Sequence, residues 1–111
     1  MYQLSYSPKS LEDLENIKCN ISERHGVDTA KRVLKKMISD IRRLEQFPSS
    51  GQDLSRIIAV QTDYWYLFTE KNYVIYRIEG SIVRVVRVLN ERQDFMRILF
   101  GVSSISDEEE V

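Results

Sequence analysis

The chain has 111 residues, enough for one domain with a single hydrophobic core. Its 16 basic and 17 acidic residues give a formal net charge of −1, which argues against a free-standing nucleic-acid binder, because such proteins carry a clear basic excess. Its apolar runs fall short of the roughly 18 residues that cross a bilayer, and the N-terminus shows no secretory-signal pattern. We therefore expect a cytoplasmic protein, with one domain in residues 1–102 and an acidic, disordered tail in residues 103–111.

Metal and cofactor chemistry is not expected. The chain has one cysteine, Cys19, and one histidine, His25, which supply neither the ligand number nor the spacing of a zinc site. It also has no glycine-rich phosphate loop, nucleophile elbow or Walker-type lysine. Cys19 lies off the apolar stripe of its helix pattern, which predicts a solvent-facing thiol. His25 lies at the C-terminal end of a predicted helix, where a basic side chain interacts favourably with the helix dipole.

The N-terminal half predicts one strand and two helices. Residues 2–6 alternate as a strand does, and Ser7-Pro8 is a helix start that predicts a first helix over 8–24. Gly26 ends it, and after a short link Asp28 is expected to cap a second helix that continues until Pro48. Each helix has one apolar stripe, so the pair should form an antiparallel hairpin.

The C-terminal half predicts a three-stranded meander and a short last helix. Turn residues follow Pro48, and 57–60 is a candidate short strand. Residues rich in aromatic and β-branched types follow, and Gly80-Ser81 suits a tight hairpin turn between the last two strands. We expect strands over 64–69, 73–78 and 82–89, and a helix over 94–100.

These elements predict an α+β fold of order β-α-α-β-β-β(-α), in which the helical hairpin packs on a mainly antiparallel twisted sheet. The central strand has apolar residues on both faces, with Val74, Tyr76 and Ile78 on one and Tyr73 and Ile75 on the other. The helical hairpin is expected to cover one face of the sheet, and the short last helix is expected to cover part of the other face. Because large apolar patches are unusual on monomers, we expect a partner protein on the remainder.

The arginines of the sheet differ in their expected roles. Arg84 and Arg87 are three positions apart, so in a regular strand they point to opposite faces. Arg77 and Arg84 are expected either to lie along the sheet with packed stems and solvated guanidinium groups, or to pair with Glu79, Glu91 or Asp94. Arg92 follows the last strand at the rim of the sheet, where a guanidinium can bind a phosphate or a carboxylate. For Trp65, Tyr66 and Tyr76 in the strands, packing is favoured over base stacking.

Three motifs together resemble the RelE/ParE superfamily of bacterial toxins from type II toxin–antitoxin modules. They are Phe47-Pro48-x-x-Gly51, Tyr73-x-x-Tyr76, and the ending from Val88 to Phe95, Val-Leu-Asn-Glu-Arg-Gln-Asp-Phe. The resemblance extends from Met1 to about Phe100. It implies a growth-inhibiting toxin of a plasmid stabilisation or addiction module, which a cognate antitoxin neutralises by packing on the toxin.

Members of this superfamily have two main targets. RelE-like toxins are ribosome-dependent endoribonucleases that cut mRNA, whereas ParE-like toxins inhibit DNA gyrase. In the RelE pattern an arginine follows the first tyrosine of the central strand, where this chain has Val74, and Glu91 stands where a basic residue is expected. The ending around Arg92 is closer to the ParE pattern. The resemblance therefore favours gyrase as target over the ribosome and mRNA; a module that binds antitoxin without toxicity is a third interpretation.

Each interpretation implies its own site residues. A gyrase inhibitor would bind its target through residues at the end of the last strand and in the last helix, namely Arg87, Arg92, Asp94, Phe95 and Arg97. An endoribonuclease would use Arg92 as a phosphate clamp and Tyr73 or Tyr66 as proton carriers.

Overall fold

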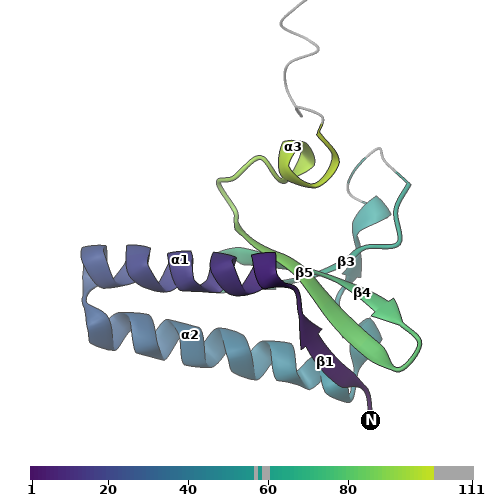
Figure 1. The fold of residues 1–111 in the computed structure, drawn as a ribbon, viewed down its shortest axis with the longest axis horizontal. Coiled ribbons are helices and arrows are strands. Elements are labelled where there is room, and N and C mark those ends of the chain that lie inside the picture. Colours follow the sequence, from purple (N-terminus) through teal and green to yellow (C-terminus); the bar gives the residue numbers. More distant parts are fainter. Residues whose placement is uncertain (57, 59–60, 102–111) are drawn as a thin grey trace, which may run out of the picture.

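The computed structural model describes residues 1–56, 58 and 61–101, with Phe95 and Met96 described by their backbone alone. The predicted domain end at 102, the tail at 103–111 and most of the candidate strand at 57–60 lie outside these residues. One strand, two helices, four further strands and a short last helix follow one another along the chain (Figure 1). The elements are β1 (Gln3–Tyr6), α1 (Pro8–His25), α2 (Val27–Arg42), β2 (Gln52–Asp53), β3 (Trp65–Thr69), β4 (Asn72–Glu79), β5 (Ile82–Asn90) and α3 (Phe95–Phe100), with single 3₁₀ turns at Arg43–Glu45, Pro48–Ser50 and Leu54–Arg56.

Ser7 begins α1 and also fastens it to the sheet. Its Oγ accepts a hydrogen bond from Ser10 N at 3.0 Å and donates one to the carbonyl of Val86 at 2.8 Å. The cap predicted from Ser7-Pro8 is therefore present, and α1 spans Pro8–His25. The same serine satisfies one free N–H of the helix and one carbonyl on the edge of β5.

The link between the helices is tighter than predicted. Gly26 alone separates α1 from α2, and its φ of +95° is a conformation that a residue with a side chain rarely adopts. Its N–H donates to the carbonyl of Ser22 at 3.0 Å, which closes α1, while α2 begins at Val27 without a side-chain cap. The prediction of an Asp28 cap was therefore wrong, because the glycine reverses the chain in one residue and Asp28 falls inside the first turn of α2.

The sheet has the order β1-β5-β4-β3-β2, in which β1 and β5 are parallel and the other pairs antiparallel. This confirms the predicted helical hairpin on a mainly antiparallel sheet. The sequence analysis missed β2, whose two residues pair with Trp65 and Tyr66. Two residues are too few for any alternating pattern, so only pairing with β3 defines this strand.

A bulge in β5 changes which residues share a face. Ile75 pairs with Arg87 and Tyr76 pairs with Val85, which leaves Val86 as the extra residue. Arg84 pairs with Arg77. Since Ile75 and Arg77 lie on one face of β4, Arg84 and Arg87 also share a face. The prediction that they point to opposite faces was wrong, because the inserted residue breaks the two-residue period.

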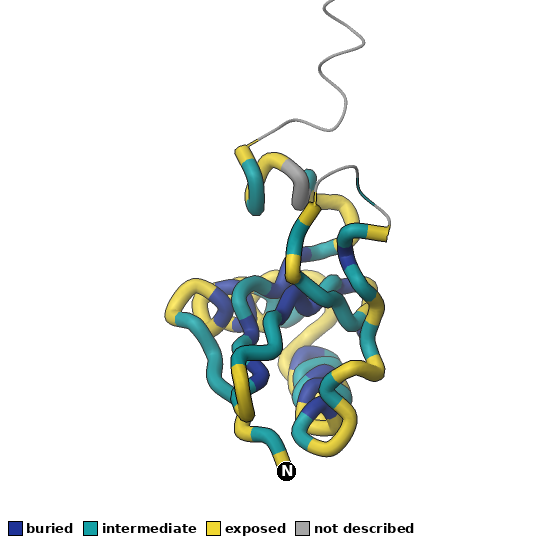
Figure 2. The backbone as a smooth tube through the Cα atoms, turned by 90° about the vertical axis from the view of Figure 1, so that its right-hand side faces the viewer, coloured by how far each residue is buried: buried dark blue, intermediate teal, exposed yellow. Residues whose placement is uncertain are grey.

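The helical hairpin covers one face of the sheet and α3 stands over the other (Figure 1). Figure 2 shows the buried residues gathered between hairpin and sheet, and exposed residues along the outer turns. The core cluster on the hairpin side consists of Leu14, Met37, Ile41, Leu44, Val74, Tyr76, Val83, Val85 and Val88. On the opposite face Ile75 and Leu89 are fully buried, and the ring of Phe100 in α3 lies 6.0 Å from that of Tyr64.

The second face of the sheet is thus better covered than its sequence predicted. Of its large apolar side chains, Phe68 is the one that is clearly exposed, at 48%, within the described residues. In that part of the chain no helix has both the length and the apolar character needed to span a membrane.

Candidate functional site

The first two motifs of the family resemblance meet in the core. The Tyr76 hydroxyl donates a hydrogen bond to the carbonyl of Pro48 at 2.7 Å and accepts one from Gly51 N at 3.2 Å. A Cβ at position 51 would collide with this hydroxyl and with the Tyr66 carbonyl. Burial raises the pKa of Tyr76 to about 12, even though the Gly51 hydrogen bond acts in the opposite direction. These motif residues therefore stabilise the fold, and Tyr76 stays protonated at neutral pH.

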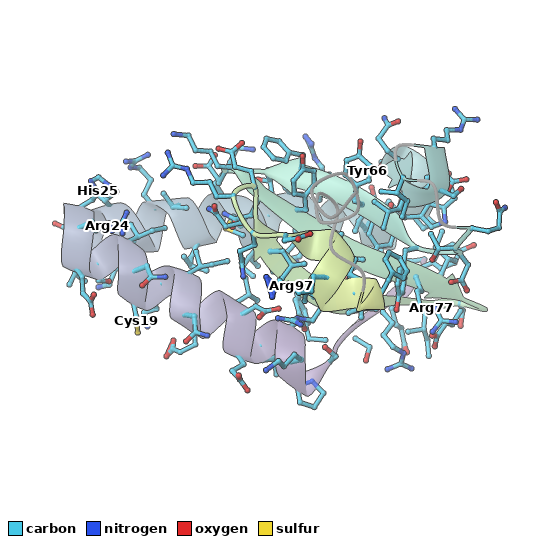
Figure 3. The ribbon with its side chains drawn as sticks, turned by 90° about the horizontal axis from the view of Figure 1, so that it is seen from above. Cys19, Arg24, His25, Tyr66, Arg77 and Arg97 are labelled. Carbon is cyan, nitrogen blue, oxygen red and sulfur yellow. The ribbon has the colours of Figure 1, made fainter. Side chains whose placement is uncertain are left out.

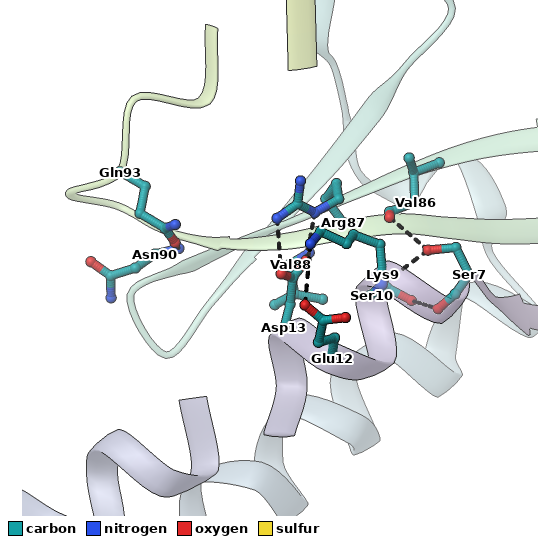
Figure 4. Close-up of polar contacts among 10 residues, drawn as sticks. All are labelled: Ser7, Lys9, Ser10, Glu12, Asp13, Val86, Arg87, Val88, Asn90 and Gln93. Carbon is teal, nitrogen blue, oxygen red and sulfur yellow. Dashed lines mark hydrogen bonds and ion pairs between the residues drawn. The ribbon is translucent and has the colours of Figure 1, made fainter. Parts of the chain in front are cut away.

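Asp13 on α1 is a key residue that the sequence analysis missed. Its carboxylate is 10% exposed and accepts hydrogen bonds from Arg87 Nε at 2.8 Å, Arg87 Nη2 at 2.9 Å and Val88 N at 2.9 Å (Figure 4). The hydrogen bonds that Arg87 donates to Asp13 raise the pKa of Arg87. They hold α1 against β5 beyond the point where β1 ends. Nothing in the spacing of Asp13 distinguishes it from the exposed acidic residues of the same helix.

This contact changes the expected role of Arg87. Its guanidinium is 18% exposed and is bound by a carboxylate of its own chain, so two of its five donors are already used. The geometry gives Arg87 a structural role at the bulge. Its predicted role in target binding stays a prediction.

A cleft of about 1030 Å³ lies between the helical hairpin and two turns of the sheet. One wall is α1, with Asn16, Asn20 and Arg24; the opposite wall comes from the β3–β4 turn and from the residues after β5, including Lys71 and Arg92. The two turns are joined by a hydrogen bond from Glu91 N to the Lys71 carbonyl at 2.9 Å. The cleft therefore brings Arg92, the predicted binding residue, next to Lys71.

The β3–β4 turn has an unusual backbone. Glu70 and Lys71 have φ values of +51° and +65°, so both are left-handed although neither is glycine or asparagine. Such residues cost of order 1 kcal/mol each. The Nδ2 of Asn72 donates to the Glu70 carbonyl at 2.7 Å and supports this conformation.

Asn72 lines the cleft and contains a buried hydrogen-bond acceptor without a partner. The residue is 3% exposed, and its Oδ1 has no partner among the described residues. A buried polar atom without a partner costs roughly 1–3 kcal/mol. Neither the prediction of Arg92 nor the motif pattern pointed to Asn72, because its burial depends on the hairpin that packs beside it.

Arg92 lies in a well-defined turn. Asn90 Oδ1 accepts from Arg92 N at 2.9 Å, and Asn90 N donates to Gln93 Oε1 at 2.7 Å. The Arg92 side chain is exposed and is in no ion pair within the described part of the chain. The turn therefore presents a cation at the rim of the cleft, with Glu91 beside it.

The remaining predicted target-binding residues lie elsewhere. Asp94 is the N-cap of α3 and accepts from Arg97 N at 3.3 Å, so its carboxylate has a structural role. Arg97 is exposed, while the side chain of Phe95 lies outside the description. Figure 3 shows Arg97 over the sheet, whereas Arg24 and His25 lie at the far end of the hairpin. Arg92 lines the cleft, whereas Arg97 is not among the residues that line it.

Tyr66 and Tyr73 form part of an aromatic cluster and do not line the cleft that contains Arg92. Their ring centroids are 5.5 Å apart in an edge-to-face arrangement, and Phe68 lies 5.0 Å from Tyr73. The register pairs Tyr66 with Ile75, which puts these rings on the α3 side of the sheet. The three residues named for an endoribonuclease therefore do not share one cavity.

Comparison with known proteins identifies the family of the chain. The model of the ParE toxin of the type II toxin–antitoxin system parDE matches residues 4–95. Curated protein sequences gave no match. Among solved structures, the chain resembles one of the chromosomal ParDE system from P. aeruginosa, with 17% identity and a TM-score of 0.68 over 81% of this chain and 96% of that one.

It also resembles a YoeB/ParE toxin from Agrobacterium tumefaciens, with 20% identity and a TM-score of 0.52 over 79% of this chain and 96% of that one. At these identities the two structures show a common fold, and the match to the family model shows the family. Both agree with the resemblance found in the three sequence motifs. The chain therefore belongs to the ParE toxin family of type II toxin–antitoxin systems.

Proposed function

We propose that this toxin arrests growth in the cytoplasm by binding DNA gyrase, without cutting RNA, as part of a plasmid-stabilising module. The observation that carries the proposal is that the arginines on the sheet are in ion pairs with carboxylates of the same chain. Cleavage of RNA by its 2′-hydroxyl needs a base, an acid for the leaving oxygen, and cations that face the phosphate as charge develops on it. Such cations have to be available to the substrate.

The arginines beside the aromatic cluster are neutralised by the chain itself. Arg77 Nη2 lies 3.1 Å from Asp63 Oδ2, and Arg77 Nη1 lies 3.8 Å from Glu79 Oε2. Arg84 Nε lies 2.9 Å from Glu79 Oε1, and Arg87 is bound by Asp13. The predicted pairing of Arg77 and Arg84 with Glu79 is thereby confirmed. Val74, at the position where the RelE pattern has an arginine, is fully buried in the core. The region around Tyr66 and Tyr73 therefore supports binding of a protein better than phosphoryl chemistry.

The cleft at Arg92 suits a protein target for a second reason. Its walls combine amide side chains with both signs of charge, as Glu70 and Glu91 accompany Lys71 and Arg92. Carboxylates repel a phosphate backbone, whereas amides and paired charges complement a polypeptide. We assign target binding to this cleft.

The test compares supercoiling by purified gyrase with primer extension on mRNA after a short pulse of toxin expression. We expect inhibition of supercoiling and no discrete cuts. Arg92→Ala should weaken inhibition about tenfold, equal to about 1.4 kcal/mol, since it removes an exposed cation from the rim. Arg32→Ala, an exposed arginine of α2 outside the cleft, is the matched control and should change inhibition less than twofold.

Discrete in-frame cuts in ribosome-bound mRNA, with supercoiling unaffected, would overturn the proposal in favour of an endoribonuclease. Absence of growth arrest would point to a module that keeps antitoxin binding and has lost toxicity.

A further inference from the structure

The β3–β4 turn holds two residues with long side chains in a conformation that favours glycine or asparagine. Thr69 pairs with Asn72, so Glu70 and Lys71 are the two central residues of the hairpin, with φ values of +51° and +65°. A turn of this shape is usually built from Asn-Gly, because a left-handed backbone is unfavourable for a residue with a long side chain. The β4–β5 turn of the same sheet has Gly80, at a φ of +59°. The β3–β4 turn therefore presents two charged side chains at a cost in stability.

Contacts from two other parts of the chain fix this turn. Thr69 Oγ1 donates a hydrogen bond to Asp40 Oδ2 of α2 at 2.7 Å. On the other side, the Lys71 carbonyl accepts from Glu91 N, in the turn after β5, at 2.9 Å. A sparsely populated backbone conformation persists where its surroundings fix it, and such residues cluster at functional sites. The left-handed turn is therefore held between α2 and the residues that follow β5.

The Lys71 side chain is available to a partner. It lines the cleft at Arg92, is exposed, and is in no ion pair within the described part of the chain. The hydrogen bond from Glu91 N ties its backbone directly to the turn that presents Arg92. A cation on a backbone that is already fixed loses less conformational entropy on binding than one on a mobile loop. The strained turn thus places a second cation on the same wall of the cleft.

We propose that Lys71 is a target-contacting residue whose ammonium group binds a side-chain carboxylate of the target protein. The β3–β4 turn keeps its strained backbone because that backbone presents this side chain beside Arg92. Glu70 and Glu91, which also line the cleft, face cationic side chains of the same target segment. The partner is therefore a polypeptide segment with both signs of charge. This proposal rests on the proposed function, because it names a contact residue and its partner group for the cleft that binds the target.

The variant Lys71→Asn separates binding from stability, because asparagine tolerates a left-handed backbone and carries no charge. Its thermal unfolding midpoint should rise by about 2–4 °C as the strain falls. Its inhibition of supercoiling by purified gyrase should nevertheless weaken about tenfold, and should depend less steeply on salt than that of the unchanged toxin. Lys71→Arg keeps the charge and should restore inhibition to within about threefold of the unchanged toxin. Lys35→Gln, which removes an exposed lysine of α2 outside the cleft, is the matched control and should change inhibition less than about twofold.

Amide hydrogen exchange at Glu91 N reports whether the turn stays in place, since this group donates to the Lys71 carbonyl. Its protection should be equal in Lys71→Asn and in the unchanged toxin. Faster exchange in the variant would assign the weaker inhibition to a displaced turn and overturn the role of the side chain. A lower unfolding midpoint for Lys71→Asn would do the same, because it would show that the lysine stabilises the turn.

The two proposals fail in different arms of the experiment. Equal inhibition by Lys71→Asn and by the unchanged toxin would overturn the role of Lys71 and leave gyrase as the target. An unchanged toxin that does not inhibit supercoiling would overturn the gyrase proposal, and the assignment of Lys71 to that target with it.

Discussion

The sheet and the outer side of the helical hairpin both carry rows of cations, but only those of the sheet are neutralised. Arg77, Arg84 and Arg87 are each in an ion pair with a carboxylate from another part of the chain. Lys31 and Lys35 of α2 are exposed and in no ion pair among the described residues. Of the paired cations, Arg87 is the largely buried one and stabilises the fold, whereas the exposed pairs of Arg77 and Arg84 contribute little. The unpaired lysines are available to a partner.

The largest expected effect comes from breaking the best-satisfied pair of the sheet. Asp13→Ala should reduce the free energy of unfolding by about 3 kcal/mol, because it leaves the largely buried Arg87 guanidinium without its carboxylate and Val88 N without an acceptor. Denaturant unfolding measures this. Glu15→Ala, at an exposed position of the same helix, is the control and should stay within about 0.5 kcal/mol. Similar losses in both variants would show that the pair is not a structural anchor.

An intermediate effect is expected at Tyr76, which links the two buried motifs. Tyr76→Phe should cost about 1–2 kcal/mol, because the Pro48 carbonyl and Gly51 N lose their partner in the core. The folded-state pKa of about 12 lies above the ordinary value of 10.0. The resulting stabilisation is complete below pH 10 and is lost as the pH rises through the folded-state pKa, since the unfolded chain releases the proton first.

Unfolding midpoints measured across the alkaline range test this prediction. The Tyr76→Phe variant should lose stability less steeply above pH 10 than the unchanged protein does. Parallel curves for the two proteins would assign the alkaline loss to other groups.

The smallest effect should come from Lys31 and Lys35, the exposed lysines of α2. Lys31→Ala and Lys35→Ala should each change the free energy of unfolding by less than about 0.5 kcal/mol, because neither side chain has an ion-pair partner among the described residues. Thermal melts at low salt measure it. A loss as large as that of Asp13→Ala would mean that these lysines stabilise the hairpin, and the contrast between the two regions would fail.

Local patterns accounted for much of the fold. The apolar stripe of α2, the Ser7-Pro8 start and the Gly80-Ser81 turn each depend on neighbours close in sequence, and all are present in the structure. The predicted stripe of α1 is buried only in part, because Leu11 is 54% exposed. The predictions that failed concern single residues with long-range consequences. The bulge at Val86 turned Arg87 to the same face as Arg84, and the left-handed Gly26 removed the expected link between the helices.

The candidate sites were predicted only in part. Arg92 was named from the motif at the end of the last strand, and it is an exposed residue at the rim of a cleft. Asn72 and Asp13 were not named, since an unpaired amide or a buried carboxylate is recognised only from the groups around it. The exposed lysines of α2, Lys31 and Lys35, lie beside an apolar row in the sequence, yet that pattern also describes any solvated helix.

By itself the amino-acid sequence determined the order of the elements, their amphipathic faces and the motifs of the family, because these follow from residue spacing of two and 3.6 and from turn chemistry. Tertiary structure decided which charges are paired, which acceptor is left free and which apolar surface is open. Those properties depend on distances between residues up to 74 positions apart, such as Asp13 and Arg87, which no local pattern encodes.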